Sequence, residues 1–118
     1  MYAIVTTVPL QPGSAETVVA LFKETNPAIV REQPDWREAR MLLDRNANTV
    51  TVVAFWANPD SYRAMAASRS FRDVMQRFSA YFAGPPEVKV TEVVVEMTLE
   101  SVSVQYATLT GDGSVIRT

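Results

Sequence analysis

Residues 52–62 read Val-Val-Ala-Phe-Trp-Ala-Asn-Pro-Asp-Ser-Tyr, and this stretch decides the fold. Val, Phe and Trp favour a pleated strand. Asn58 is a helix N-cap residue, and Pro59 suits the first helical position because its missing N–H would be unpaired there anyway. The stretch therefore predicts a strand with Trp56 at its end, which passes almost without a loop into a helix that carries Tyr62.

The same kinds of signal continue on both sides of this stretch. Expected strands cover residues 2–8, 36–44, 49–57 and 87–97. Expected helices begin at residues 14, 59 and 70; Asn26-Pro27 ends or kinks the first, and Gly84-Pro85-Pro86 stops the third. This order is the split βαβ pattern of an α+β, ferredoxin-like fold, an antiparallel sheet of four strands with helices on one face.

The strand at residues 49–57 is apolar on both faces. One face carries Trp56 with Val50, and the other carries Val53 and Phe55 beside two Thr residues. Helices cover only one face, so we expect a homodimer in which two sheets pack together. The alternative is that residues 98–118, a C-terminal extension after the domain of residues 1–97, cover the open face as an extra strand or hairpin.

Two charged side chains lie on the neighbouring strand. Glu38 and Arg40 alternate with the residues between them, so they are expected to share a face with Trp36. They either pair across a dimer or form a solvated rim.

Composition excludes several classes of function. The chain is 47% hydrophobic and 20% charged with a net charge of -2, which gives no basic surface for nucleic acid. It contains no Cys and no His, so thiol nucleophiles, imidazole bases, zinc fingers and His-ligated haem are not expected. The four glycines match no phosphate-binding loop, so no nucleotide cofactor is expected. Without His and Cys, no metal site is expected either. The apolar run at residues 2–10 is too short for a membrane helix, and we expect a cytoplasmic protein.

The sequence resembles the antibiotic biosynthesis monooxygenase family. The resemblance rests on the order of elements, the size of the chain, Trp56 before Asn58-Pro59, the helix start at Ser70-Phe71 and the Val-rich last strand. The resemblance covers about residues 1 to 97. It implies a dimeric α+β barrel. The family includes cofactor-free quinone-forming monooxygenases and haem-degrading enzymes, as well as members of unknown activity.

The haem-degrading branch is disfavoured. Its Asn, Trp and His positions match Thr6, Met65 and Met75 in this sequence, and all three depart from that pattern. The polyketide-oxidising branch is more similar, because its Trp at a strand end and a Tyr six residues later are matched by Trp56 and Tyr62. Its Asn four residues before the Trp is replaced by Val52.

The resemblance thus implies a cofactor-independent monooxygenase acting on a small aromatic or polyketide-like phenol or hydroquinone. Trp56 and Tyr62 are the candidate catalytic residues, as donors to a substrate oxygen. The expected substrate pocket is lined by Phe22, Met65, Phe71, Met75 and Phe78. In the alternative, the same aromatic side chains are core packing, and the chain is a non-catalytic small-ligand-binding or structural dimer. A cavity of roughly 300 Å³ or more beside Trp56 and Tyr62 would favour the enzyme, and a filled interior there would favour the alternative.

Overall fold

The protein is an α+β fold, as the sequence predicts, and a computed structural model describes its residues 1–102. The elements follow in chain order as β1 (Tyr2–Pro9), α1 (Ala15–Val30), β2 (Trp36–Asp44), β3 (Thr49–Trp56), α2 (Pro59–Ala66), α3 (Arg69–Ser79) and β4 (Glu87–Glu92). The four strands form one sheet in the order β2-β3-β1-β4. Every neighbouring pair is antiparallel.

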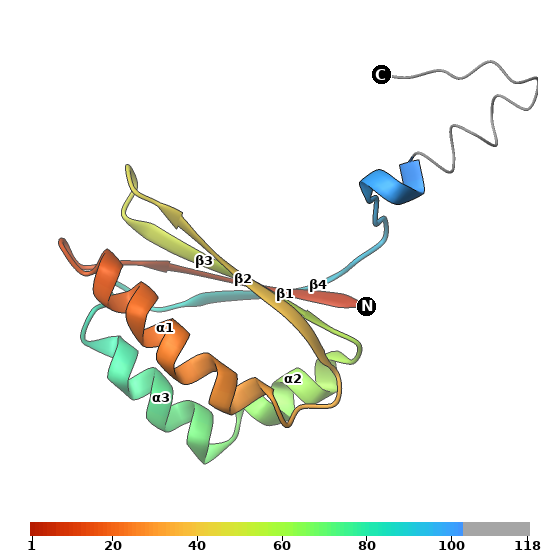
Figure 1. The fold of residues 1–118 in the computed structure, drawn as a ribbon. Coiled ribbons are helices and arrows are strands. Elements are labelled where there is room, and N and C mark those ends of the chain that lie inside the picture. The colour runs from red at the N-terminus through yellow and green to blue at the C-terminus, as the bar shows by residue number, and fades with distance from the viewer. Residues whose placement is uncertain (103–118) are drawn as a thin grey trace, which may run out of the picture.

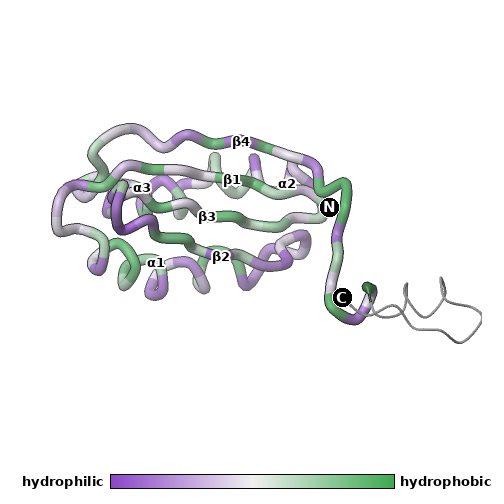
Figure 2. Tube along the Cα trace, turned by 90° about the horizontal axis from the view of Figure 1, so that it is seen from above, coloured by the Kyte–Doolittle hydropathy of each residue, from purple (hydrophilic) through white to green (hydrophobic). Residues whose placement is uncertain are grey.

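The three helices all lie on one face of the sheet (Figure 1). The other face is open, and no helix crosses it when the sheet is viewed from above (Figure 2). Two buried clusters lie between the helices and the sheet. One is centred on Val18 and Phe78, and the other joins Ile4, Trp56 and Met65. Within residues 1–102, only the helical face of the sheet is therefore buried.

Strand β4 is shorter than predicted. Apolar residues continue to Met97, but the strand ends at Glu92, which pairs with Tyr2 at the beginning of β1. One more backbone hydrogen bond joins Val93 N to Met1 O (2.9 Å), just before β1. The predicted extension to Met97 is wrong, because β4 ends opposite the beginning of β1 and residues 93–98 are not in a strand.

Of the two alternatives for Asn26-Pro27, the structure excludes the end of the helix: α1 continues to Val30, with Pro27 inside it. Helix α3 differs from prediction at both ends. It begins at Arg69, one residue earlier than expected, and its cap is not Ser70 but Ser68, which accepts a hydrogen bond from Phe71 N (3.2 Å). It also ends at Ser79, before Gly84, because the following residues bond to the end of β1. One of these bonds joins Ala83 N to Pro9 O (2.8 Å).

The prediction that Trp36 shares a face with Glu38 and Arg40 is wrong. The register of β2 against β3 shifts between Trp36 and Glu38, which is a β-bulge. A bulge inserts one residue and reverses the alternation of faces. Trp36 therefore points to the helical side, whereas Glu38 pairs opposite Phe55 and forms an exposed ion pair with Arg40 (2.7 Å).

The chain beyond β4 leads away from the sheet (Figure 1). Residues 99–102 form a helical turn, so the extension does not begin as a strand. The rest of the predicted extra strand or hairpin lies outside the described residues. Among residues 1–102, no helix has the length and apolar character needed to cross a bilayer.

Candidate functional site

A cavity of about 400 Å³ lies between the helices and the covered face of the sheet. Small side chains form its floor. Ala39, Ala54 and Ile4 lie in one row across β2, β3 and β1, and the next row contains Val52 beside Thr6. Space remains above these residues because larger side chains on the helices hold the two layers apart.

All seven residues singled out from the sequence line this cavity. They come from α1, the end of β3, α2 and α3: Phe22, Trp56, Tyr62, Met65, Phe71, Met75 and Phe78. The cavity exceeds the size of roughly 300 Å³ at which small-ligand sites begin. These side chains are therefore core residues that also border a space large enough for a small molecule.

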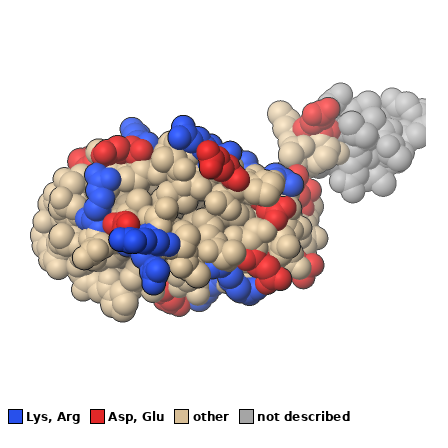
Figure 3. All heavy atoms as spheres, turned by 90° about the horizontal axis from the view of Figure 1, so that it is seen from below, with Lys and Arg blue, Asp and Glu red and all other residues tan. Residues whose placement is uncertain are grey.

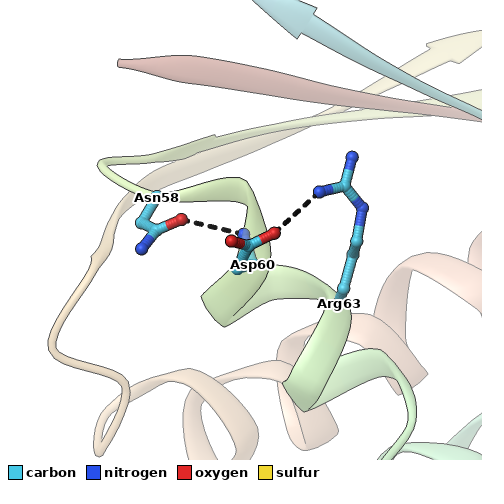
Figure 4. A network of polar contacts seen from close by, with 3 residues as sticks. All are labelled: Asn58, Asp60 and Arg63. Atoms are coloured by element: carbon cyan, nitrogen blue, oxygen red, sulfur yellow. Dashed lines mark hydrogen bonds and ion pairs between the residues drawn. The ribbon is translucent and has the colours of Figure 1, made fainter.

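The strand–helix junction that joins Trp56 to Tyr62 has the predicted cap. The Asn58 side chain accepts a hydrogen bond from Asp60 N (2.9 Å), and Pro59 occupies the first helical turn. The Asp60 carboxylate in turn pairs with Arg63 (2.9 Å), one turn further along α2 (Figure 4). This arrangement sets the direction in which α2 leaves the sheet, and so the position of Tyr62 relative to Trp56.

A second set of contacts ties the junction to the beginning of β2. Ala57 N donates to the backbone oxygen of Asp35 (2.7 Å), and the Ser61 hydroxyl donates to the Asp35 carboxylate. The residues immediately before and after Trp56 and Tyr62 are thus held by hydrogen bonds. The two aromatic rings lie on a fixed frame.

Trp56 has a buried donor without an acceptor. Its side chain is 1% exposed, and its indole N–H makes no hydrogen bond within residues 1–102. The ring packs edge to face with Tyr62, with centroids 5.8 Å apart and planes at 72°. Buried N–H groups are rarely left unpaired, because losing the hydrogen bond to water costs about 1–3 kcal/mol. The indole N–H is therefore an unusual feature of this core.

Tyr62 remains protonated at neutral pH. Burial against the cavity raises the pKa of its hydroxyl above the usual value of 10.0, since removing water disfavours the phenolate. The neutral hydroxyl is a hydrogen-bond donor. It is not suited to act as a base in this environment.

The cavity lining is almost wholly apolar and carries no charged side chain among the described residues. Charged residues lie instead on the outside, where basic and acidic side chains are interspersed on the helical side (Figure 3). Within residues 1–102, no group of three potential His, Cys, Asp or Glu ligands is placed to hold a metal ion. The site thus favours an uncharged ligand whose polar atoms are few.

Sequence reasoning left two polar residues of the cavity, Thr6 and Asn26, out of the predicted pocket. Asn26 lies on α1 with Val18, Phe22 and Val30, and these four residues line the cavity at intervals of four. That spacing marks one face of a helix. The pattern is visible in the sequence only if α1 is continued through Pro27, and ending the helix there removed Asn26 from the predicted site.

Comparison with known proteins identifies the family. The sequence profile described as "Antibiotic biosynthesis monooxygenase" matches residues 1–77. A search of curated proteins found no match.

Two solved structures illustrate the shared fold. SnoaB, a cofactor-independent oxygenase from Streptomyces nogalater, is 20% identical, with 81% of this chain and 95% of that chain covered and a TM-score of 0.68. A protein of Mycobacterium tuberculosis is 11% identical, with 82% and 98% covered and a TM-score of 0.68. The chain belongs to the antibiotic biosynthesis monooxygenase family.

Proposed function

We propose that this chain is a cofactor-independent monooxygenase that oxidises a small aromatic or polyketide-like phenol or hydroquinone with O₂. One observation carries the proposal: Trp56, whose indole N–H is buried and has no partner among residues 1–102, lines a cavity without charged side chains. Such a donor is suited to a phenolic or ketone oxygen. Membership of the family and the fold shared with SnoaB support the same reaction class.

The cavity suits a reaction in which the substrate supplies the electrons. An electron-rich ring passes an electron to O₂, and the two radicals join to form a C–O bond. The ring carbon that gained the oxygen, a methylene in an anthrone or a C–H carbon in a phenol or hydroquinone, then becomes a carbonyl; one oxygen atom stays in the product, and the other leaves as water with the two hydrogens that the substrate loses. In this proposal the protein excludes water, orients the ring and stabilises the charge that forms on the substrate oxygen.

Trp56 and Tyr62 are the residues assigned to that last task. Each has one side-chain donor, and their rings are already in contact. A donor fixed before the reaction stabilises developing charge more than water does, because it needs no reorganisation. With no acid or base in the lining, proton release is left to the substrate and to reduced oxygen.

The test is oxygen uptake by the purified full chain. We expect consumption of O₂ with at least one member of a panel of hydroquinones and anthrones, without added flavin, nicotinamide or metal, and an unchanged rate in the presence of a chelator. The control is Trp56→Phe, which keeps an aromatic ring but removes the N–H. A panel that gives no uptake above the uncatalysed rate would contradict the proposal.

A non-catalytic ligand-binding dimer is the second candidate. Val52 lies on the cavity floor at the position where the resemblance places an Asn in the oxidising branch, so one polar group is absent there. The same cavity then binds an aromatic molecule without transforming it. Ligand binding without oxygen uptake would favour this candidate.

The proposed assembly is a homodimer through the open face of the sheet. Ala3, Val5, Val53 and Phe55 form paired positions on that face, and Leu42 on β2 is 53% exposed. The described chain beyond β4 leads away from the sheet, and its apolar side chains are themselves exposed, with Val94 at 80% and Leu99 at 86%. A second copy would cover the open face and bury upwards of about 1,200 Å².

A further inference from the structure

We propose that Asn26 on α1 is a substrate-binding residue of the cavity, which selects aromatic ligands that carry an oxygen. The class of ligand in this inference rests on the proposed function. The choice of Asn26 rests on three observations: the side of α1 that it occupies, the end of the cavity at which it lies, and the poor fit of an Asn to a helix interior at this position.

Asn26 faces the cavity. It is partly buried and belongs to the row of α1 residues at intervals of four that line this space, in which Val18, Phe22 and Val30 are apolar. The Asn26 amide is thus the only polar side chain that this helix contributes to the lining. It adds both a donor and an acceptor, whereas the Trp56 indole is a donor only.

Asn26 lies toward the same end of the cavity as Trp56. It is one helical turn before Val30, where α1 ends. From there Gln33 N bonds to Val30 O (2.9 Å) and Trp36 N bonds to Gln33 O (3.3 Å), which brings the chain to β2. Trp36 pairs directly with Trp56. Asn26 therefore lies toward the Trp56 end of the cavity, and Phe82 and Val88 line the other end, where Thr6 pairs with Val88.

The fold alone gives no reason for Asn at this position. Asn is a weak helix former in a helix interior, and a residue before proline is disfavoured in the α conformation. Neighbouring Thr25 satisfies its hydroxyl by donating to Leu21 O (2.8 Å), but the Asn26 side chain makes no hydrogen bond within residues 1–102. A leucine would fit the helix and its apolar surroundings better. The amide is accounted for if it binds a polar atom of the ligand.

The experiment compares two probes that differ by one hydroxyl, 1-naphthol and naphthalene, by equilibrium dialysis against the full chain. Asn26→Leu replaces the amide by an apolar group of similar size. We expect this variant to bind 1-naphthol about tenfold more weakly, the worth of about one hydrogen bond. Naphthalene should bind it as well as or better than wild type. The matched control, Asn46→Leu, makes the same substitution in the exposed hairpin loop and should change neither affinity.

Three results would overturn the inference: an unchanged affinity for 1-naphthol, an equal loss for both probes, or no binding of 1-naphthol by wild type. Asn26→Ala, which favours helix, repeats the comparison if Asn26→Leu does not fold.

The dialysis result is independent of turnover. If wild type binds 1-naphthol in an Asn26-dependent way but consumes no O₂ with the phenol panel, the oxygenase proposal fails and this inference stands. If wild type consumes O₂ and Asn26→Leu keeps the same KM, the inference fails and the oxygenase proposal stands.

Discussion

The two faces of the sheet are built from the same strands, yet they differ in how their apolar side chains are covered. On the helical face, Trp56 and Met65 are buried, but the side chains around them leave a cavity. On the open face, Val53 and Phe55 pair with neighbouring strands, but nothing in the described chain covers them. The comparison teaches that the covered face leaves a small internal space, whereas the other face leaves a broad exposed apolar surface.

Their polar groups support this distinction. Across the open face, the Thr7 and Thr51 hydroxyls bond to each other (3.3 Å), and Glu38 pairs with Arg40 (2.7 Å). These groups are satisfied within the chain, so they need no ligand. On the helical face the Trp56 indole has no such partner. A single buried donor can be satisfied by one acceptor atom, whereas an exposed apolar face can be buried only by another large surface.

The largest expected effect is on assembly. Phe55→Asp places a carboxylate at the centre of the open face, and in a face-to-face dimer that charge would lose its water without gaining a partner. We expect wild type to sediment as a dimer at micromolar concentration and the variant to sediment as a monomer or aggregate. Gln76→Asp, on the exposed side of α3, introduces the same charge elsewhere and should remain a dimer.

A single wild-type species near the 13.1 kDa mass of one chain would contradict the dimer. The open face would then need another kind of cover.

The second effect is on turnover and concerns only the helical face. Tyr62→Phe keeps the ring that packs on Trp56 and deletes the hydroxyl. One donor to a developing anion is worth on the order of 3 kcal/mol, so we expect kcat to fall roughly a hundredfold. The rate is measured as oxygen uptake, and circular dichroism checks the fold. Tyr81→Phe makes the same change at a tyrosine outside the cavity lining and should keep the wild-type rate. An unchanged rate for Tyr62→Phe would assign Tyr62 to packing.

The sequence predicted most of the fold because local signals agree with tertiary structure. The run of Val, Phe and Trp in β3 and the Asn58-Pro59 cap need no distant partner to be recognised. The apolar faces of β3 and the helices also converge on one space, so the lining of the cavity could be predicted. The sequence could not predict whether that space is hollow, because this depends on how closely α1 and α3 approach the small side chains on the floor.

The errors arise where a distant part of the chain decides the outcome. Strand β4 ends at Glu92, opposite Tyr2 of β1, although apolar residues continue beyond it. The bulge after Trp36 depends on pairing with β3. Asn26 was missed because Pro27 is a strong local signal to end a helix, whereas packing against the sheet keeps α1 intact for another turn.

The smallest expected effect is on stability at alkaline pH, and it distinguishes a buried Tyr62 from an exposed one. Burial raises the pKa of the Tyr62 hydroxyl above 10.0, its value in the unfolded chain. Between the two pKa values the folded state therefore binds more protons than the unfolded state, and the free energy of unfolding falls as pH rises. The contribution is fully present below pH 10 and is lost as pH rises through the folded-state pKa.

Urea unfolding of wild type and Tyr62→Phe at a series of pH values measures this contribution to the free energy of unfolding. Because Tyr62→Phe cannot ionise at this position, its midpoint should fall less steeply above pH 10 than that of wild type, and parallel curves would show that the hydroxyl is solvated.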